Sequence, residues 1–309
     1  MVNSLPPLAL IAGPTASGKS ALALALAQAT GGVIINADSA QLYGDLEVVS
    51  ARPAAADLTL AEHRLYGVLD GDDPCSAARW ATMARAEIQQ IQRTGRLPIL
   101  VGGTGLYLRT LLDGIAPIPP IDPDIRAAVR AAPVAINRAA LQALDPVAAA
   151  RIGEADTTRI ARALEVVRST RQPIGHWHAA RTGGFAPDVK LSPLLVLPPR
   201  AWLYARCDAR FAAMIDVGAV AEVEALLARE LDPDLPVMRA IGVREIADHL
   251  RTGHDAEALL AAGAQATRRY AKRQYTWFAN QPPPDWPRFT DPLTPQSMAS
   301  ALAMLGPNA

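Results

Sequence analysis

The chain has little cysteine and no net charge. Two cysteines among 309 residues are too few for a disulfide framework or a cysteine-based zinc site, which is typical of proteins in a reducing compartment. Thirty basic and thirty acidic residues balance. A global electrostatic attraction to nucleic acid is therefore excluded, and any anion-binding site must be local.

Long apolar runs are also missing. No run reaches the ~18 residues of a membrane-spanning helix, and residues 1–7 lack the basic segment of a secretory signal. Half of the residues are hydrophobic and 19% are charged, a globular composition that at this length allows more than one domain. We expect a cytoplasmic protein without membrane contact.

The clearest motif spans residues 13–20. An apolar, strand-like run (residues 8–12) leads into a glycine turn with the spacing G-x-x-x-x-G-K-[ST], and a helix-forming run follows. This pattern predicts a phosphate-binding loop, in which backbone N–H groups and a lysine face an anion while a hydroxyl can bind Mg²⁺. The predicted phosphate-binding residues are Gly13, Pro14, Thr15, Ala16, Ser17, Gly18, Lys19 and Ser20.

Two further short strands end in polar residues. Residues 33–36 lead to Asp38, and residues 97–101 lead through a glycine turn to Thr104. Since ligands bind beyond the carboxyl ends of parallel strands, we expect both side chains on the same edge as Lys19. Asp38 could instead simply cap the turn after it.

These elements predict an α/β fold with a P-loop NTPase-like parallel sheet flanked by helices. Residues 117–197 have a helical pattern and a net charge of +3, and a strand then returns at 194–197. We therefore expect an inserted helical subdomain, 117–197, within a core formed by 1–116 and 198–309. The proline-rich tail after residue 282 is expected to be peripheral.

Local patterns predict further elements. Residues 63–70 resemble a strand, and residues 256–280 have a largely helical pattern. Within the helical subdomain, helices are expected to begin at Asp122, Asp145 and Asp156.

The phosphate loop alone leaves three interpretations open. The chain could hydrolyse a nucleoside triphosphate, or be a small-molecule kinase, or be a transferase whose loop holds a leaving diphosphate. A triphosphatase needs an apolar strand that ends in a magnesium-binding aspartate, but residues 97–101 end in Gly-Gly-Thr.

A basic and aromatic run at residues 268–277 bears on this choice. Arginine and lysine interleaved with aromatic residues are typical of contact with an RNA backbone and splayed bases. The same pattern also fits a solvated helix face with Trp277 packed inside. Arginines elsewhere add local positive charge that suits a polyanionic substrate.

The chain resembles the bacterial tRNA dimethylallyltransferase family over roughly residues 8–278. The phosphate loop is shared with many families, whereas Gly-Gly-Thr-x-Leu-Tyr (102–107) and Lys-Arg-Gln-x-Thr-Trp (272–277) are much more diagnostic. Further matching stretches are Asp38-Ser39 with Gln41 and Tyr43, Ala51-Arg52-Pro53, His63-Arg64-Leu65, residues 145–152, residues 162–166, and Arg206 with Arg210-Phe211.

The resemblance implies transfer of a dimethylallyl group from dimethylallyl diphosphate to the exocyclic amine of an adenosine. That adenosine lies 3′ of the anticodon in tRNAs that read codons beginning with U. The implied partners are the anticodon stem-loop, which the inserted subdomain grips, and Mg²⁺ near Ser20, and we expect a monomer. Asp38 would accept the amine proton, Thr104 would support the reaction centre, and Arg210 would join the phosphate loop at the diphosphate.

The resemblance also implies a tRNA-facing set drawn from several segments. It comprises Asp38, Ser39, Ala40, Gln41, Thr104, Arg126, Thr158, Arg159, Ile160, Ala161, Arg162, Arg239, Ala240, Ile241, Gly242, Val243, Arg244, Lys272, Arg273, Gln274 and Trp277. Val243 and Glu245 depart from the Gly-Tyr-Arg-Gln pattern usual in the family. A carboxylate is unfavourable beside an RNA backbone, so Glu245 is not expected to contact phosphate.

Overall fold

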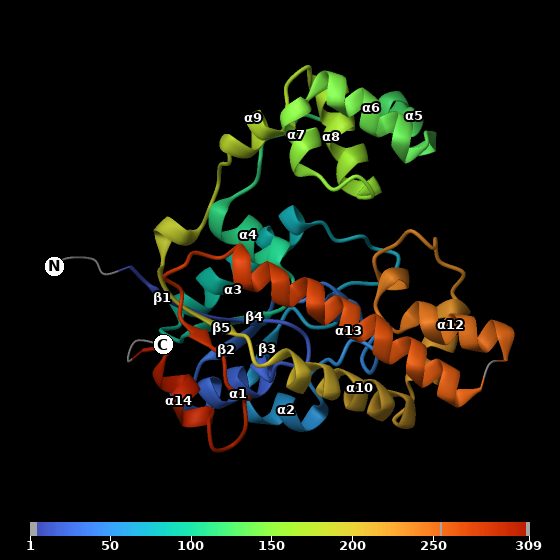
Figure 1. The fold of residues 1–309 in the computed structure, drawn as a ribbon. Coiled ribbons are helices and arrows are strands. Elements are labelled where there is room, and N and C mark those ends of the chain that lie inside the picture. Colours follow the sequence, from blue (N-terminus) through green and yellow to red (C-terminus); the bar gives the residue numbers. More distant parts are fainter. Residues whose placement is uncertain (1–4, 254, 307–309) are drawn as a thin grey trace. The chain divides into compact units, whose positions relative to one another are not determined.

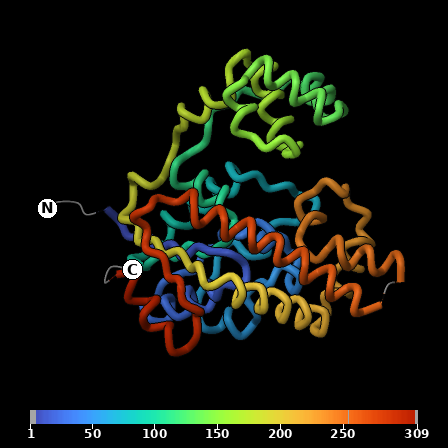
Figure 2. Tube along the Cα trace, in the orientation of Figure 1, coloured from blue at the N-terminus to red at the C-terminus, as the bar shows by residue number. Residues whose placement is uncertain are grey.

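The computed structural model describes residues 5–253 and 255–306. It divides the chain into two compact units, Met1–Leu111 with Ala186–Ala309, and Leu112–Phe185. Figure 1 shows the secondary structure of both units and Figure 2 follows the same chain as a tube. No helix among the described residues is long and apolar enough to span a membrane.

The first unit contains a six-stranded parallel sheet, which confirms the predicted α/β fold. Its strand order is β3-β2-β4-β1-β5-β6, and every pairing is parallel. The strands are β1 (Pro7–Ala12), β2 (Val33–Asn36), β3 (Glu62–Arg64), β4 (Pro98–Gly102), β5 (Lys190–Val196) and β6 (Arg288–Phe289). β1, which precedes the phosphate loop, lies between β4 and β5, so the loop emerges at the centre of the sheet edge.

Helices cover both faces of this sheet. Those of the first unit are α1 (Lys19–Thr30), α2 (Ala55–Leu60), α3 (Ala77–Arg93), α10 (Arg200–Asp216), α11 (Ala219–Leu227), α12 (Val243–Thr252), α13 (Ala256–Asn280) and α14 (Met298–Ala303), while α4 (Gly105–Asp113) runs across the boundary. The bounds of α13 agree with the helical pattern predicted for residues 256–280.

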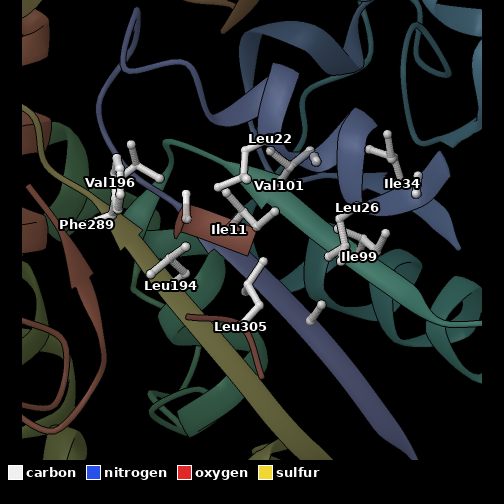
Figure 3. Close-up of a cluster of buried hydrophobic side chains, with 14 of the residues drawn as sticks. Ile11, Leu22, Leu26, Ile34, Ile99, Val101, Leu194, Val196, Phe289 and Leu305 are labelled. Atoms are coloured by element: carbon white, nitrogen blue, oxygen red, sulfur yellow. The ribbon is translucent and has the colours of Figure 1, made fainter. Parts of the chain in front are cut away.

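Apolar side chains on both faces of the strands form the core of the first unit. Ile11 of β1 and Val101 of β4 meet Leu22 and Leu26 of α1 (Figure 3). Leu10, on the opposite face of β1, is equally buried. Because successive strand residues point to opposite faces, continuous apolar strands indicate a sheet covered on both sides.

The tail after residue 282 is not peripheral, so that prediction is wrong. Phe289 extends the sheet by pairing beside Val196, and Leu293 and Leu305 join the core around α1. The tail contributes isolated apolar residues between prolines and polar groups rather than a periodic run. Its packing is therefore hard to recognise from local sequence.

The strand predicted over residues 63–70 is shorter than expected. β3 ends at Arg64 because Leu65 and Gly67 have φ angles of 63° and 60°. The left-handed conformation of these residues turns the chain out of the sheet.

The second unit is helical. It contains α5 (Pro123–Ala131), α6 (Val134–Leu144), α7 (Pro146–Arg151), α8 (Thr157–Thr170) and α9 (Ile174–Ala179), packed around a buried core that includes Leu141 and Leu164. Asp122, Asp145 and Asp156 cap α5, α7 and α8, as the sequence predicted. The unit ends at 185 rather than at the expected 197, because the chain from Lys190 onward pairs with β1.

Candidate active site

The phosphate loop connects β1 to α1 and depends on two unusual backbone positions. Gly18 has a φ of 93°, as expected for a glycine, and Ala16 also adopts a left-handed φ of 62°. Gly13 serves a different purpose, since a Cβ there would lie 2.4 Å from the Val196 carbonyl oxygen. Its lack of a side chain thus permits the loop to approach β5.

Three cationic side chains support the loop. The Lys19 side chain is buried, and its Nζ donates to the Pro14 carbonyl at 3.3 Å. From α10, Arg210 donates to the Thr15 hydroxyl and the Nε of Arg206 donates to the Ala16 carbonyl at 3.0 Å. The loop therefore gathers positive charge in spite of the chain's neutrality.

Two polar atoms at the loop are buried without a hydrogen-bond partner in the described residues, Ser17 Oγ and Arg210 Nε. An unsatisfied buried donor carries a free-energy cost of about 1–3 kcal/mol unless a ligand or water completes it. Together with the positive end of α1, these donors form a site suited to an anion.

Burial lowers the pKa of Lys19 from 10.5 to about 8, and the nearby Asp38 carboxylate partly opposes this shift. Burial disfavours the charged ammonium, whereas a bound anion would stabilise the ammonium and raise its pKa again. The site is therefore tuned to gain positive charge when a phosphate binds.

Asp38 follows β2 and is held by its own neighbours. Its backbone N–H donates to Asn36 Oδ1 at 2.7 Å, and its Oδ1 accepts from the Ala40 N–H at 3.1 Å. The capping role considered from the sequence is therefore real. It occupies only one carboxylate oxygen, and Asp38 also lines a cavity.

Thr104 joins the two turns that follow β2 and β4. Its Oγ1 accepts from the Ser39 N–H at 3.0 Å, and its own N–H donates to the Ala37 carbonyl at 3.2 Å. A Cβ on Gly102 would lie 2.1 Å from the same Ala37 oxygen. As expected, Asp38 and Thr104 lie at the same edge of the sheet, on two turns that hydrogen-bond to each other.

A cavity of about 360 Å³ opens beside these groups. Its lining includes the polar side chains of Thr15, Asp38 and Arg210, the apolar side chains of Phe211 and Met214, and Tyr270. The volume and mixed lining are typical of small-molecule sites. A lining that contains both charged and apolar side chains suits a ligand that has a charged group and a hydrocarbon group.

Tyr270 was missed by sequence reasoning. Burial raises the pKa of its phenol, as does the Asp38 carboxylate, while hydrogen bonding to Thr104 and Gln274 acts in the opposite direction. The phenol is therefore protonated throughout the physiological range. Its position one helical turn before Gln274 could have indicated a shared face.

Ser20 lies in the first turn of α1 and borders a second cavity of about 230 Å³, together with Gln41, Arg52 and His63. No cluster of three or more His, Cys, Asp or Glu residues in the described ranges could hold a metal ion by itself. A single hydroxyl fits Mg²⁺ when substrate phosphate oxygens and water complete its coordination.

The predicted tRNA-facing residues separate into exposed and buried sets. The exposed side chains are Arg126, Thr158, Arg159, Arg239, Arg244, Lys272 and Arg273, and the partly exposed ones are Asp38, Ser39, Ala40, Gln41, Thr104, Arg162, Ile241 and Trp277. Gly242 and Ala240 are buried in the loop before α12. The side chains of Ile160, Ala161, Val243 and Gln274 are buried, which corrects the expectation that these side chains face RNA.

The second unit organises three arginines around one carboxylate. Glu165 is fully buried, yet it pairs with Arg130 at 2.6 Å, Arg162 at 3.9 Å and Arg126 at 4.0 Å. The cluster joins α5 to α8 and carries a net charge of +2. Glu165 therefore holds a cationic patch in place while neutralising only part of it.

Glu245 has a structural explanation. Its Oε2 accepts from the Gly242 N–H at 3.0 Å and so caps the start of α12. Val243 is buried against the same helix start. Both residues that depart from the family pattern thus lie in the first turn of α12, where Glu245 serves as a cap.

Comparisons with known proteins identify the family of this chain. The profile of the family described as "IPP transferase" matches residues 41–281, and that described as "Isopentenyl transferase" matches residues 6–73. A tRNA dimethylallyltransferase of Erythrobacter litoralis is 60% identical over 288 residues, covering 92% of this chain and 91% of the relative. The chain belongs to the tRNA dimethylallyltransferase family. It is accordingly a tRNA-modifying transferase, and the sequence resemblance is confirmed.

Solved structures give the same result for the fold. A full-length tRNA isopentenylpyrophosphate transferase from Bacillus halodurans is 29% identical, covers 98% of this chain and 96% of its own, and superposes with a TM-score of 0.70. A eukaryotic dimethylallyltransferase acting on tRNA is 26% identical, with a TM-score of 0.75, covering 88% of this chain and 69% of its own.

Proposed function

We propose that the cavity beside the phosphate loop joins dimethylallyl diphosphate to the exocyclic amine of an adenosine in tRNA. The adenosine would be the one 3′ of the anticodon in tRNAs that read codons beginning with U. The observation that carries this proposal is that Asp38 and the anion-binding groups Thr15 and Arg210 line one cavity. A proton acceptor and a leaving-group cradle are the two functions that the reaction requires.

The phosphate loop would hold the leaving group. Breaking the allylic C–O bond places negative charge on diphosphate, and Lys19, Arg210 and the N-terminus of α1 stabilise that charge. The unpartnered donors at Ser17 and Arg210 would be completed by phosphate oxygens. Ser20, with those oxygens, would hold Mg²⁺, which neutralises further charge on the departing diphosphate.

Asp38 would accept the proton. The adenine amine is a weak nucleophile, so its nitrogen forms the new C–N bond as a carboxylate removes one of its protons. One oxygen of Asp38 is fixed by the Ala40 N–H, which orients the other without consuming it. Thr104, bonded to the Ser39 backbone, would keep the loop that carries Asp38 in place.

The tRNA would be bound by exposed cations of both units. In the first unit, Arg239 lines the cavity, and Arg244 on α12 and Lys272 and Arg273 on α13 are exposed. In the second unit, the Glu165 cluster offers three further arginines. A base in the anticodon loop must leave its stack to reach the cavity, which is base flipping. Contacts to the phosphate backbone offset that cost and make binding salt-dependent.

A small-molecule kinase or an NTPase is the alternative. Both need a carboxylate to hold the nucleotide's magnesium. β4 ends at Gly102 and is followed by Gly103 and Thr104, where such enzymes often have an aspartate. The apolar side chains of Phe211 and Met214 in the cavity lining favour a hydrocarbon ligand over a ribose. Because its substrate is tRNA, we place the enzyme in the cytoplasm, and we propose that it acts as a monomer.

A transfer assay tests the proposal. Purified enzyme, Mg²⁺, radiolabelled dimethylallyl diphosphate and unmodified tRNA are incubated, ATP hydrolysis is followed in parallel, and the labelled nucleotide is located by nuclease digestion and mass spectrometry. Label on the adenosine 3′ of the anticodon without ATP turnover is expected. ATP turnover without labelled tRNA would instead support the kinase or NTPase alternative.

A further inference from the structure

The amide of Gln274 lies between two loops of the active site. The Thr15 N–H donates to its Oε1 at 2.8 Å, and its Nε2 donates to the Gly103 carbonyl at 2.9 Å. Gln274 is only 6% exposed. This single side chain therefore connects the phosphate loop after β1 to the turn after β4 that carries Thr104.

The turn is shaped to receive this amide. A Cβ on Gly103 would lie 2.3 Å from Gln274 Nε2, so a side chain there would displace the bridge. Two residues further along, a Cβ on Gly105 would lie 2.4 Å from the Trp277 ring. Gly103 and Gly105 are thus explained by close packing against α13, since neither has a positive φ.

One stripe of α13 makes all of these contacts. Tyr270, Gln274 and Trp277 follow the i, i+4, i+7 spacing of a helix face. The Tyr270 phenol lies near Thr104, Gln274 donates to the Gly103 carbonyl, and the Trp277 ring packs against Gly105. Each of three consecutive turn residues has its own partner on the helix.

The neighbours of Gln274 point elsewhere. Lys272 and Arg273 are exposed, and Arg273 lies over the Tyr270 ring, 5.5 Å from its centre. The basic motif on α13 therefore has two faces with different environments. An outer face carries cations, and an inner face carries an amide whose donor and acceptor are both used within the protein.

We propose that Gln274 is a positioning residue that fixes the phosphate loop relative to the Asp38–Thr104 centre, and that it does not contact RNA. This rests on the proposed function of the cavity. A buried amide with both ends bonded sets the separation of the two loops, because losing either bond leaves an unsatisfied backbone group. Shifts of about 1 Å between reacting groups lower rates by about a hundredfold.

Gln274→Met tests the proposal, with Lys272→Ala as the matched exposed neighbour. Two dissociation constants are measured by independent means, that of inorganic pyrophosphate by calorimetry and that of an anticodon stem-loop RNA by fluorescence anisotropy. Gln274→Met is expected to weaken pyrophosphate binding about tenfold or more and to leave RNA affinity within about twofold of wild type. Lys272→Ala is expected to weaken RNA binding and to leave pyrophosphate affinity within about twofold of wild type.

Gln274→Glu supplies a readout that general loss of structure would not produce. A protonated carboxyl can accept from Thr15 and donate to Gly103, as the amide does, whereas a carboxylate cannot donate. The single-turnover rate of this variant relative to wild type is therefore expected to rise as pH falls. This second variant also keeps the test available if Gln274→Met does not fold.

The proposal would be overturned if Gln274→Met weakened RNA binding and left pyrophosphate affinity unchanged. It would also be overturned if Gln274→Met changed neither constant and the single-turnover rate of Gln274→Glu relative to wild type did not depend on pH. These outcomes are separate from the proposed function. Pyrophosphate affinity is measured without transfer, and failure of wild-type enzyme to label tRNA would refute the function whatever the variants show.

Discussion

Arg210 of α10 donates a hydrogen bond to the hydroxyl of Thr15, 195 residues earlier in the chain. The same guanidinium keeps a buried Nε without a partner among the described residues. Arg210 thus binds the phosphate loop and still has an N–H group that can donate to a ligand.

Replacing Arg210 by methionine is expected to weaken inorganic pyrophosphate binding by about 10- to 150-fold, the range for hydrogen bonds to a charged group of 1.5–3 kcal/mol. Calorimetry measures this constant. Arg251→Met is the control, because Arg251 is exposed and pairs only weakly with Asp248 at 3.5 Å. Equal affinities for the two variants would remove Arg210 from the anion site.

Lys19 is expected to give pyrophosphate binding a pH dependence. Its pKa in the folded protein, about 8, lies below the ordinary 10.5. The buried ammonium therefore costs folding free energy, about 3 kcal/mol, at pH values below 8, and this cost is lost as pH rises from 8 to 10.5.

A bound anion should raise the pKa of Lys19 again, so wild-type enzyme should take up a proton when pyrophosphate binds near pH 8–9. The uptake is obtained by calorimetry in buffers of different ionisation enthalpy. Lys19→Met corrects for titration of pyrophosphate itself. Identical proton uptake in both proteins would mean that Lys19 does not meet the anion.

Thr104 should matter through its hydroxyl. Thr104→Val keeps the shape of the side chain but leaves the Ser39 N–H without its acceptor, and should lower the single-turnover rate at least tenfold. Thr104→Ser restores the hydroxyl and is expected to recover most of the rate. If valine and serine behaved alike, the bond to Ser39 would have no part in turnover.

The C-terminal tail should contribute to stability. Leu305 is 4% exposed in the core around α1, whereas its neighbour Met304 is 39% exposed. Leu305→Ala is expected to lower the free energy of unfolding by about 2–5 kcal/mol, and Met304→Ala by less than about 0.5 kcal/mol. Urea titration compares the two, and similar midpoints would show that the tail is dispensable.

Local signals made much of the fold predictable. The phosphate loop, the caps at Asp122, Asp145 and Asp156, and the length of α13 all depend on residues close together in sequence. The strand ends also placed Asp38 and Thr104 on one edge correctly, because parallel strands align their carboxyl ends.

The remaining features depend on contacts between distant segments. The amide of Gln274 looks like part of a basic RNA-binding run, and only its partners Thr15 and Gly103 show that it faces inward. Phe289 and Leu293 lack periodicity, so their burial follows from the sheet edge that they complete. Glu245 looked unfavourable for RNA until its bond to Gly242 identified it as a helix cap.

Asp38 is the proposed acceptor of the proton from the adenine amine, and the single-turnover rate of Asp38→Asn tests this role. Asparagine keeps an oxygen for the Ala40 N–H but cannot accept the proton. With tRNA and pyrophosphate affinities unchanged, dimethylallyl transfer is expected to fall by about 10²- to 10⁴-fold. A rate within about threefold of wild type would mean that Asp38 is not the proton acceptor.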